Sequence, residues 1–242
     1  IEFLEEAGSI RALDLFVLER SLAQVEKWRA AGLGIVPVAV NLSRTTLVHP
    51  SAFASVLAIQ SRYPELPPSA LELEITERGG GIETAAFQSI ADRFHACGLR
   101  LSLDDFGSQY ANLSLFTNVK FDAIKIDFFD RDEAGKPLDW LDTTGLLTPK
   151  QLHMVEARMK AAREAAGDDV DIIMENHSYP DALGAVQLAK LAEKYGIMAF
   201  EEPNTPTTQT VEYITKYTSV PIANGERLFS RWQYAEYFKK NL

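Results

Sequence analysis

The sequence has little cysteine, no long apolar run and a shortage of positive charge. Cys97 is the only cysteine among 242 residues, so an internal disulfide cannot form and a reducing, cytoplasmic location is expected. No apolar stretch approaches the roughly 18 residues of a membrane helix, and the amino-terminal segment is acidic, so we expect neither a membrane span nor a signal peptide. The net charge of −10 argues against a nucleic-acid polymer as partner. A small anionic ligand could still be recruited by a bound metal ion.

Strand-like apolar runs alternate with helical patterns along the whole chain. Strands are expected at 35–43, 71–76, 99–105, 121–127, 170–176, 197–202 and 220–226. Helices are expected at 11–32, 49–64, 83–98, 111–119, 148–167, 181–196, 207–218 and 230–241. This alternation predicts a parallel sheet, and polar residues at the strand ends favour an α/β fold of the TIM-type (β/α) barrel, formed by residues 1–242 as one domain. The longer segment 128–146 is expected to be a loop on the active face.

Seven strands can be counted, whereas the usual barrel closes with eight. Long apolar parallel edges at 35–43 and 220–226 would be costly to expose. We therefore expect one of two outcomes. Either the first and last strands pair in a strained smaller barrel, or two chains associate through these open sheet edges, and self-association is the favoured outcome.

Three carboxylates in the last third of the chain recur at a nearly constant step. Glu175, Glu201 and Glu226 each follow a short apolar run, and they are separated by 26 and then 25 residues. The strand ends of a β/α repeat meet at one face, so these side chains are expected to converge. Three acidic oxygen ligands suit a hard divalent cation, Mg²⁺ or Mn²⁺, without an organic cofactor.

Motifs in the first half resemble another family. They are VNLS at 40–43, LELEITER at 71–78, DDFG at 104–107 and KID at 125–127. In this order they resemble the EAL-domain phosphodiesterases, which hydrolyse cyclic di-GMP, over residues 1–127. The resemblance implies that two metal ions and the attacking water would be surrounded by Asn41, Glu74, Asp104, Asp105 and Lys125.

Parts of the EAL pattern are missing. The E-A-L strand and the later ligand-bearing strands have no counterpart in this sequence, and Gln109 replaces a glycine of the family motif. Asp104 and Asp105 are adjacent, so ordinary strand pleating can point only one of them inward. We therefore do not expect phosphodiesterase activity.

From about residue 123 onward the sequence resembles the enolase superfamily, in its mandelate racemase and sugar-acid dehydratase branch. The motifs are MENH at 174–177, FEEP at 200–203 and NGER at 224–227. The resemblance implies that Glu175, Glu201 and Glu226 bind Mg²⁺, which stabilises an enediolate. It also implies that His177 is the acid that expels the leaving hydroxyl.

Simpler interpretations exist for several of these polar residues. His177 could merely cap the following helix. Lys125, which both families place at this strand end, could be a counter-charge for the surrounding carboxylates. Glu72, Glu77 and Glu202 are interpreted as solvated residues on the barrel rim.

The two resemblances together lead to one reading of the chain. Residues 1–127 form an EAL-like half and residues 128–242 an enolase-superfamily-like half of a single barrel. The base dyad and the capping domain of the dehydratases have no counterpart in the sequence, so turnover is not expected. We interpret the chain as an engineered or recombined chimeric barrel scaffold that retains a divalent-metal carboxylate site. The alternatives are a Mg²⁺-dependent sugar-acid dehydratase, which is a lyase, and a cyclic di-GMP phosphodiesterase.

Overall fold

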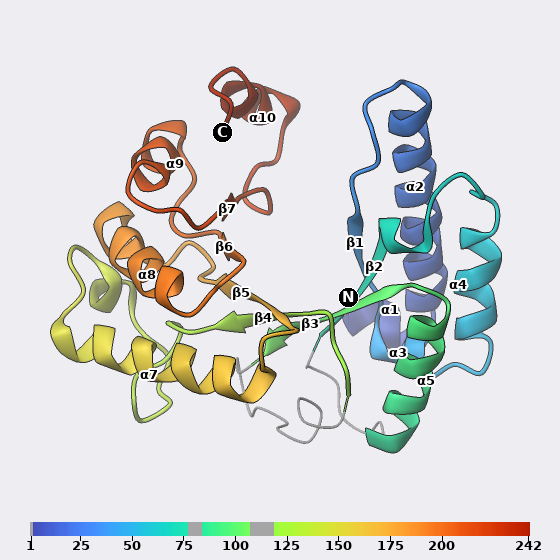
Figure 1. Ribbon diagram of the computed structural model, residues 1–242, viewed down its shortest axis with the longest axis horizontal. Coiled ribbons are helices and arrows are strands. Elements are labelled where there is room, and N and C mark those ends of the chain that lie inside the picture. Colours follow the sequence, from blue (N-terminus) through green and yellow to red (C-terminus); the bar gives the residue numbers. More distant parts are fainter. Residues whose placement is uncertain (1, 77–83, 107–118) are drawn as a thin grey trace. The chain divides into compact units, whose positions relative to one another are not determined.

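The computed structural model describes residues 2–76, 84–106 and 119–242 (Figure 1). The helix expected at 111–119 lies almost wholly outside these residues, as do Glu77 and Gln109. The chain forms two compact units. Of the described residues, unit 1 comprises 2–76, 84–106 and 119–123, and unit 2 comprises 124–242.

Unit 1 contains three parallel strands with helices between them. Its elements are α1 (Glu2–Glu6), α2 (Ile10–Ala30), β1 (Val38–Asn41), α3 (Arg44–Leu47), α4 (Ala52–Gln60), the 3-10 turn η1 (Pro68–Ala70), β2 (Leu71–Thr76), α5 (Thr84–Ala96) and β3 (Arg100–Phe106). The strand β2 pairs in parallel with β1 on one side and with β3 on the other. Along α2, Leu18, Leu22 and Val25 are fully buried, so the three-to-four-residue spacing of its apolar side chains forms the face toward the core.

Unit 2 repeats the alternation of strand and helix. Its elements are β4 (Ala123–Asp127, of which Ala123 belongs to unit 1), the 3-10 turn η2 (Trp140–Thr143), α7 (Pro149–Ala166), β5 (Asp171–Glu175), α8 (Ala182–Lys194), β6 (Ala199–Glu201), α9 (Thr208–Thr215), β7 (Ile222–Ala223) and α10 (Arg231–Phe238). The strand β6 pairs in parallel with β5 and with β7. Segment 128–146 is irregular, as expected, with one antiparallel bridge between Arg131 and Pro137.

Within each unit, neighbouring strands follow the order of the sequence. Parallel strands in sequence order, with helices between them, are the element order of a (β/α) barrel. The predicted α/β fold of the TIM type is therefore confirmed, with seven strands among the described residues.

The first and last strands are shorter than the sequence suggested. The strand expected at 35–43 spans only Val38–Asn41, and Ile35 and Val36 before it are 38% and 58% exposed. The strand expected at 220–226 consists of Ile222 and Ala223, both half-buried. Pro37 and Pro221 directly precede the two strands and have no N–H to donate, which shortens the hydrogen-bonded pairing. The prediction of long apolar edges was therefore wrong.

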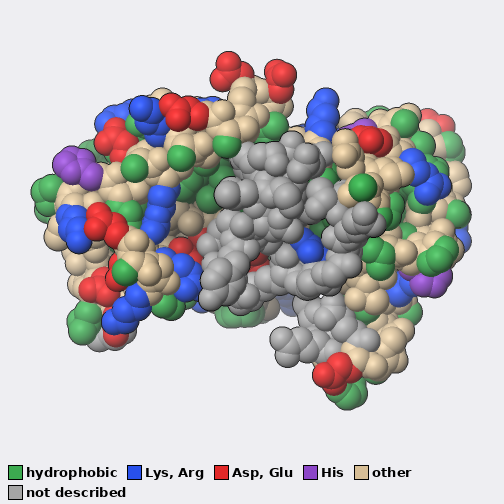
Figure 2. Space-filling model, turned by 90° about the horizontal axis from the view of Figure 1, so that it is seen from below, with side chains coloured by type: hydrophobic (Ala, Val, Ile, Leu, Met, Phe, Trp, Pro, Cys, Tyr) green, Lys and Arg blue, Asp and Glu red, His purple; other side chains and the backbone are tan. Residues whose placement is uncertain are grey.

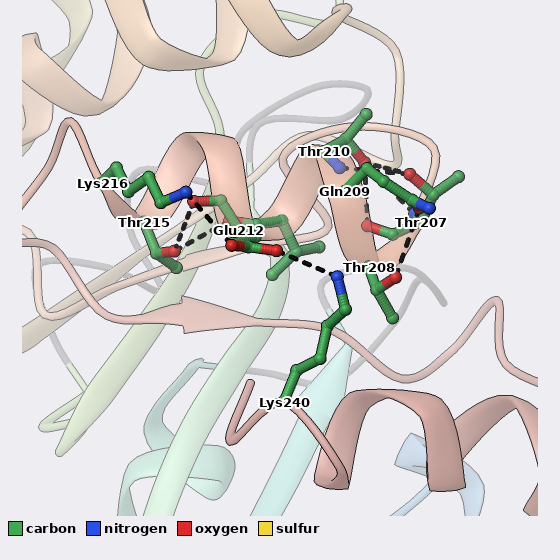
Figure 3. Close-up of polar contacts among 9 residues, drawn as sticks. Thr207, Thr208, Gln209, Thr210, Glu212, Thr215, Lys216 and Lys240 are labelled. Atoms are coloured by element: carbon green, nitrogen blue, oxygen red, sulfur yellow. Dashed lines mark hydrogen bonds and ion pairs between the residues drawn. The ribbon is translucent and has the colours of Figure 1, made fainter.

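Polar caps fix where the helices of unit 2 begin. Thr148, Thr207 and Ser230 each cap a helix and exchange hydrogen bonds with the residue three positions later. Figure 3 shows this arrangement at the start of α9. It also shows Glu212 of α9 bound to Lys240, whose Nζ lies 3.0 Å from Oε2. The end of the chain after α10 is thus tied to α9.

None of the described helices combines the length and the apolar composition of a membrane span. On the face displayed in Figure 2, the described acidic and basic side chains are interspersed rather than gathered by sign.

Candidate functional site

The ends of β5 and β6 place two of the three expected metal ligands opposite each other. Glu175 is the last residue of β5 and Glu201 the last of β6, and the two are partners in the strand register. Glu226 is not on a strand, because β7 ends at Ala223, the register partner of Glu201. Glu175 is buried at 6% exposure, whereas the Glu226 side chain is 45% exposed.

Two of these carboxylates are already paired with cations of the protein. The Nζ atom of Lys125, on β4, lies 3.1 Å from Oε2 of Glu201. Glu226 faces its neighbour Arg227, with 3.4 Å between Oε1 and Nε. The Lys125 contact agrees with its interpretation as a counter-charge. The convergence of Glu175, Glu201 and Glu226 on one ion stays a prediction, as do the proposed roles of Lys125 and His177.

A compact group of potential ligands forms around Glu175. Asp127, Glu175 and His177 each offer one ligand atom, and these atoms lie within 4.8 Å of one another. The Nδ1 atom of His177 is 3.2 Å from Oδ1 of Asp127, and its Nε2 atom is 3.5 Å from Oε1 of Glu175. Asp127 and Glu175 are the last residues of neighbouring strands, so parallel pairing brings their carboxylates to the same edge.

The carboxylates keep His177 protonated. The hydrogen bond with Asp127 is the main cause that raises the pKa of His177 from its ordinary value of 6.5 to about 9; burial opposes it, and the negative charges of Asp127, Glu175 and Glu226 add to it. At neutral pH the imidazolium therefore donates toward carboxylates on both sides. It can act as an acid, but it must lose a proton before it can ligate a metal.

The donor set fits a divalent cation. Carboxylate oxygens suit Mg²⁺ and Mn²⁺, and an added imidazole favours Mn²⁺ over Mg²⁺. The observed group shares only Glu175 with the three metal ligands expected from the sequence. It also contains Asp127, which was not among the residues expected at a metal site. Asp127 closes an apolar run just as Glu175 does, so the strand-end rule would have found it if applied to every strand.

The conformation around Asp127 depends on the segment that follows β4. Arg158 of α7 donates hydrogen bonds of 2.8–3.0 Å to the carbonyl oxygens of Phe128, Arg131 and Asp132. Burial, followed by the charge of Asp127, raises the pKa of Asp130 to about 6. One side chain of α7 thus holds the loop that begins at the candidate site.

The first-half set occupies the strand ends of unit 1. Asn41 is the last residue of β1 and the register partner of Glu74, which is 4% exposed. Asp104 is the register partner of Thr76. Asp105 has a φ of 57°, so the strand is not ordinarily pleated there. The premise of ordinary pleating therefore does not hold at Asp105, and the inward direction of only one of the two aspartates stays a prediction.

Of the residues interpreted as solvated rim carboxylates, Glu202 is buried and Glu72 is half-buried. Glu202 is 1% exposed. The side chain of Glu72 is 15% exposed and lies 3.4 Å from Nε of Arg100. Their surroundings supply hydrogen bonds or a cation, which is the condition under which carboxylates are buried.

A pocket of about 450 Å³ lies beside the start of α7 and not around Glu175. Its lining includes Lys136, Leu138, Leu146 and Met154, but none of the three clustered ligand residues. This pocket is therefore separate from the group of Asp127, Glu175 and His177.

Comparison with known families accounts for the two sets of motifs. The model of the EAL domain matches residues 1–128, and the model of the enolase C-terminal domain-like family matches residues 109–242. The chain belongs to both families, one in each half. Each match covers more than half of the chain, and the two overlap across the segment that includes β4.

Individual relatives divide in the same way. A cyclic di-GMP phosphodiesterase of Pseudomonas aeruginosa is 30% identical over 138 residues, which are 57% of this chain and 23% of that protein. A D-gluconate dehydratase of Thermoproteus tenax is 38% identical over 99 residues, which are 40% of this chain and 20% of that protein. The chain thus spans about a fifth of the length of these curated relatives.

A solved EAL domain extends the likeness beyond the first half. The EAL domain of Mycobacterium smegmatis DcpA has a TM-score of 0.56 and 27% identity, and the alignment covers 78% of this chain and 75% of that one. An alignment that covers 78% of the chain must reach past residue 128, so the likeness to this EAL domain is not confined to the first half.

Proposed function

We propose that this chain is a recombined (β/α) barrel that binds a divalent cation at the strand ends of unit 2 and catalyses neither parental reaction. The observation that carries the proposal is the group of Asp127, Glu175 and His177, whose ligand atoms lie within 4.8 Å of one another. Both parent families are typically dependent on divalent metals, and the two family matches in one chain support recombination.

The cation would be held by carboxylate oxygens. Asp127 and Glu175 would supply the first two, and Glu201 and Glu226 could add theirs once their contacts with Lys125 and Arg227 are exchanged. A bound Mg²⁺ or Mn²⁺ would stabilise negative charge that develops on a ligand. A small anionic ligand is therefore the partner we propose, and the single Cys97 is consistent with a cytoplasmic location.

The dehydratase alternative is favoured by one observation. His177 is protonated at neutral pH and lies beside Glu175, where an acid could protonate a leaving hydroxyl. Dehydration also needs a base that removes the proton beside the substrate carboxylate. None of the residues assigned here takes that role, and the missing proton transfer would be worth about 10²–10⁴-fold in rate.

Calorimetric titration of Mn²⁺ and Mg²⁺ into the metal-free protein tests the site. We expect saturable binding, and we expect Glu175→Gln to weaken it at least tenfold, because that variant removes a charged ligand from the centre of the group. Glu164→Gln, on the exposed surface of α7, is the matched control and should leave the affinity unchanged. Absence of binding by the unaltered protein, or equal affinity in Glu175→Gln, would contradict the proposal.

Turnover assays distinguish the scaffold from both enzymes. With Mn²⁺ or Mg²⁺ present, hydrolysis of cyclic di-GMP and dehydration of sugar acids should not exceed that of the metal in buffer. Cyclic di-GMP hydrolysis that disappears in Asp104→Ala would instead support the phosphodiesterase. Dehydration that disappears in His177→Gln would support the lyase.

A further inference from the structure

Backbone strain gathers around the strand-end loops of unit 2. The described chain has five non-glycine residues with positive φ, and three of them are His177, Ser178 and Glu202, at 47°, 63° and 44°. Left-handed backbone is unfavourable for a non-glycine residue, so it persists only where surrounding contacts hold it. His177 belongs to the candidate site, so the contacts that hold its turn bear on the site itself.

The buried carboxylate of Glu202 supplies those contacts. Its Oε2 accepts a hydrogen bond from Oγ of Ser178 at 3.1 Å, and its Oε1 accepts one from the backbone N–H of Gly225 at 2.7 Å. Its backbone carbonyl accepts from the N–H of Ser178, and its own N–H donates to the carbonyl of Ala223, both at 2.8 Å. Glu202 therefore joins the loops after β5, β6 and β7.

The loops joined in this way are the ones that carry the expected ligands. Ser178 follows His177, and Gly225 precedes Glu226. Arg227 makes a second tie, because its Nη2 donates to the carbonyl oxygen of His177 at 2.7 Å. The turn of His177 is thus fixed from the loop after β6 and from the loop after β7.

We propose that Glu202 is a positioning residue of the strand-end site. Its carboxylate holds the turn of His177 and the loop of Glu226 in fixed relation to Glu175, although it is not itself a ligand. The inference deepens the proposed function and, as far as metal affinity is concerned, rests on it. It replaces the interpretation of Glu202 as a solvated rim residue.

Two substitutions distinguish a positioning role of the Glu202 side chain from an effect of its negative charge. Glu202→Ala removes both side-chain hydrogen bonds, and we expect Mn²⁺ affinity to fall by about 10- to 100-fold, the usual effect of losing a partner that orients a metal ligand. Glu202→Gln can still accept from Gly225 and can donate to Oγ of Ser178, whose hydroxyl is free to rotate. We therefore expect the glutamine to restore affinity to within about threefold of the unaltered protein.

Glu193 provides a matched control in the same unit. Its Oε1 accepts hydrogen bonds from N–H of Ser219 at 2.7 Å, from Oγ1 of Thr218 at 3.0 Å and from Oγ of Ser219 at 3.2 Å, before the start of β7. Glu193→Ala should lower stability by a similar mechanism but leave Mn²⁺ affinity unchanged. A loss of affinity in both alanine variants would indicate general destabilisation and overturn the proposal. A loss in both Glu202 variants would assign the effect to charge and would also overturn it.

Amide hydrogen exchange tests positioning without metal. Exchange at Ser178 and Gly225 should accelerate in Glu202→Ala, recover in Glu202→Gln and remain unchanged in Glu193→Ala. If the unaltered protein binds no Mn²⁺ but shows this exchange pattern, the proposed metal function fails and the positioning role stands. Unchanged exchange in Glu202→Ala overturns the positioning role.

Ser178→Ala is the fallback variant if Glu202→Ala does not fold. It removes one of the two side-chain hydrogen bonds of Glu202. Unaltered Mn²⁺ affinity and unaltered exchange in Ser178→Ala would overturn the positioning role.

Discussion

Replacing Arg163 with alanine is expected to lower the free energy of unfolding of unit 2 by about 3 kcal/mol. The Arg163 guanidinium, near the end of α7, donates to the carbonyl oxygens of Gly167 and Val170 at 2.8 Å, of Gly196 at 2.9 Å and of Tyr195 at 3.0 Å. A hydrogen bond from a charged donor contributes about 1.5–3 kcal/mol. Water can replace the donor at the exposed carbonyls, so the total is smaller than four such contributions.

Two further variants define the origin of the Arg163 effect. Lysine has no planar fork with which to reach four carbonyls, so Arg163→Lys should recover only part of the loss. Lys160→Ala, three residues earlier on an exposed face of α7, should change stability by less than about 0.5 kcal/mol. Urea unfolding followed by tryptophan fluorescence and by circular dichroism measures all three. If Arg163→Ala lowers the free energy of unfolding by less than about 1 kcal/mol, the hydrogen bonds of Arg163 to these carbonyl oxygens do not contribute the expected stability.

The sequence predicted β2 and β5 well but overestimated β6, which also has a neighbour on each side and spans only Ala199–Glu201 of the expected 197–202. The expected strand at 170–176 became Asp171–Glu175, and the one at 71–76 was reproduced without change. These strands are closed on both sides by parallel partners, so their apolar runs are buried as the pattern requires. The lengths of the first and last strands were overestimated, because a run of apolar residues does not show where the hydrogen bonds to a neighbouring strand end.

The candidate site was predictable in part, for the same physical reason. Residues that end a strand, such as Glu175 and Glu201, were placed correctly at the strand ends, since register fixes them. Glu226 lies in a loop, where its direction depends on contacts with Arg227 and neighbouring chain. The role of Glu202 depends on hydrogen bonds to residues 24 and 23 positions away, which no local pattern reports.

The fold consists of repeated β/α units, and this explains how segments similar to two families can follow each other in one chain. Each β/α unit places its polar residues at the carboxyl end of its own strand, whichever family the unit comes from. The family matches overlap across β4, whose Asp127 contacts His177 of the enolase-like half. Asp127, a member of the ligand group, therefore lies in the segment that both family models match.

The pair of His177 and Asp127 should make stability depend on pH in a defined window. The folded-state pKa of His177 is about 9, above the 6.5 expected after unfolding, so the folded state binds the proton more tightly. The contribution is fully present below pH 6.5 and is lost as the pH rises through about 9. The difference corresponds to at most about 3 kcal/mol, and exposure of 30% of the His177 side chain reduces it.

Urea unfolding of the metal-free protein between pH 6 and 10, compared with His177→Gln, isolates this contribution. Lysine and tyrosine side chains titrate near the upper limit in both proteins, so only the difference between the two curves reports His177. The raised pKa of Asp130, about 6, makes the protein lose stability as the pH rises from 3.8 through 6, and this titration extends to about pH 7 in both proteins, so it cancels in the difference between the two curves. We expect the advantage of the unaltered protein over His177→Gln to shrink steadily from pH 6.5 to 9. An advantage that stays constant across this range would show that Asp127 does not hold the proton on His177.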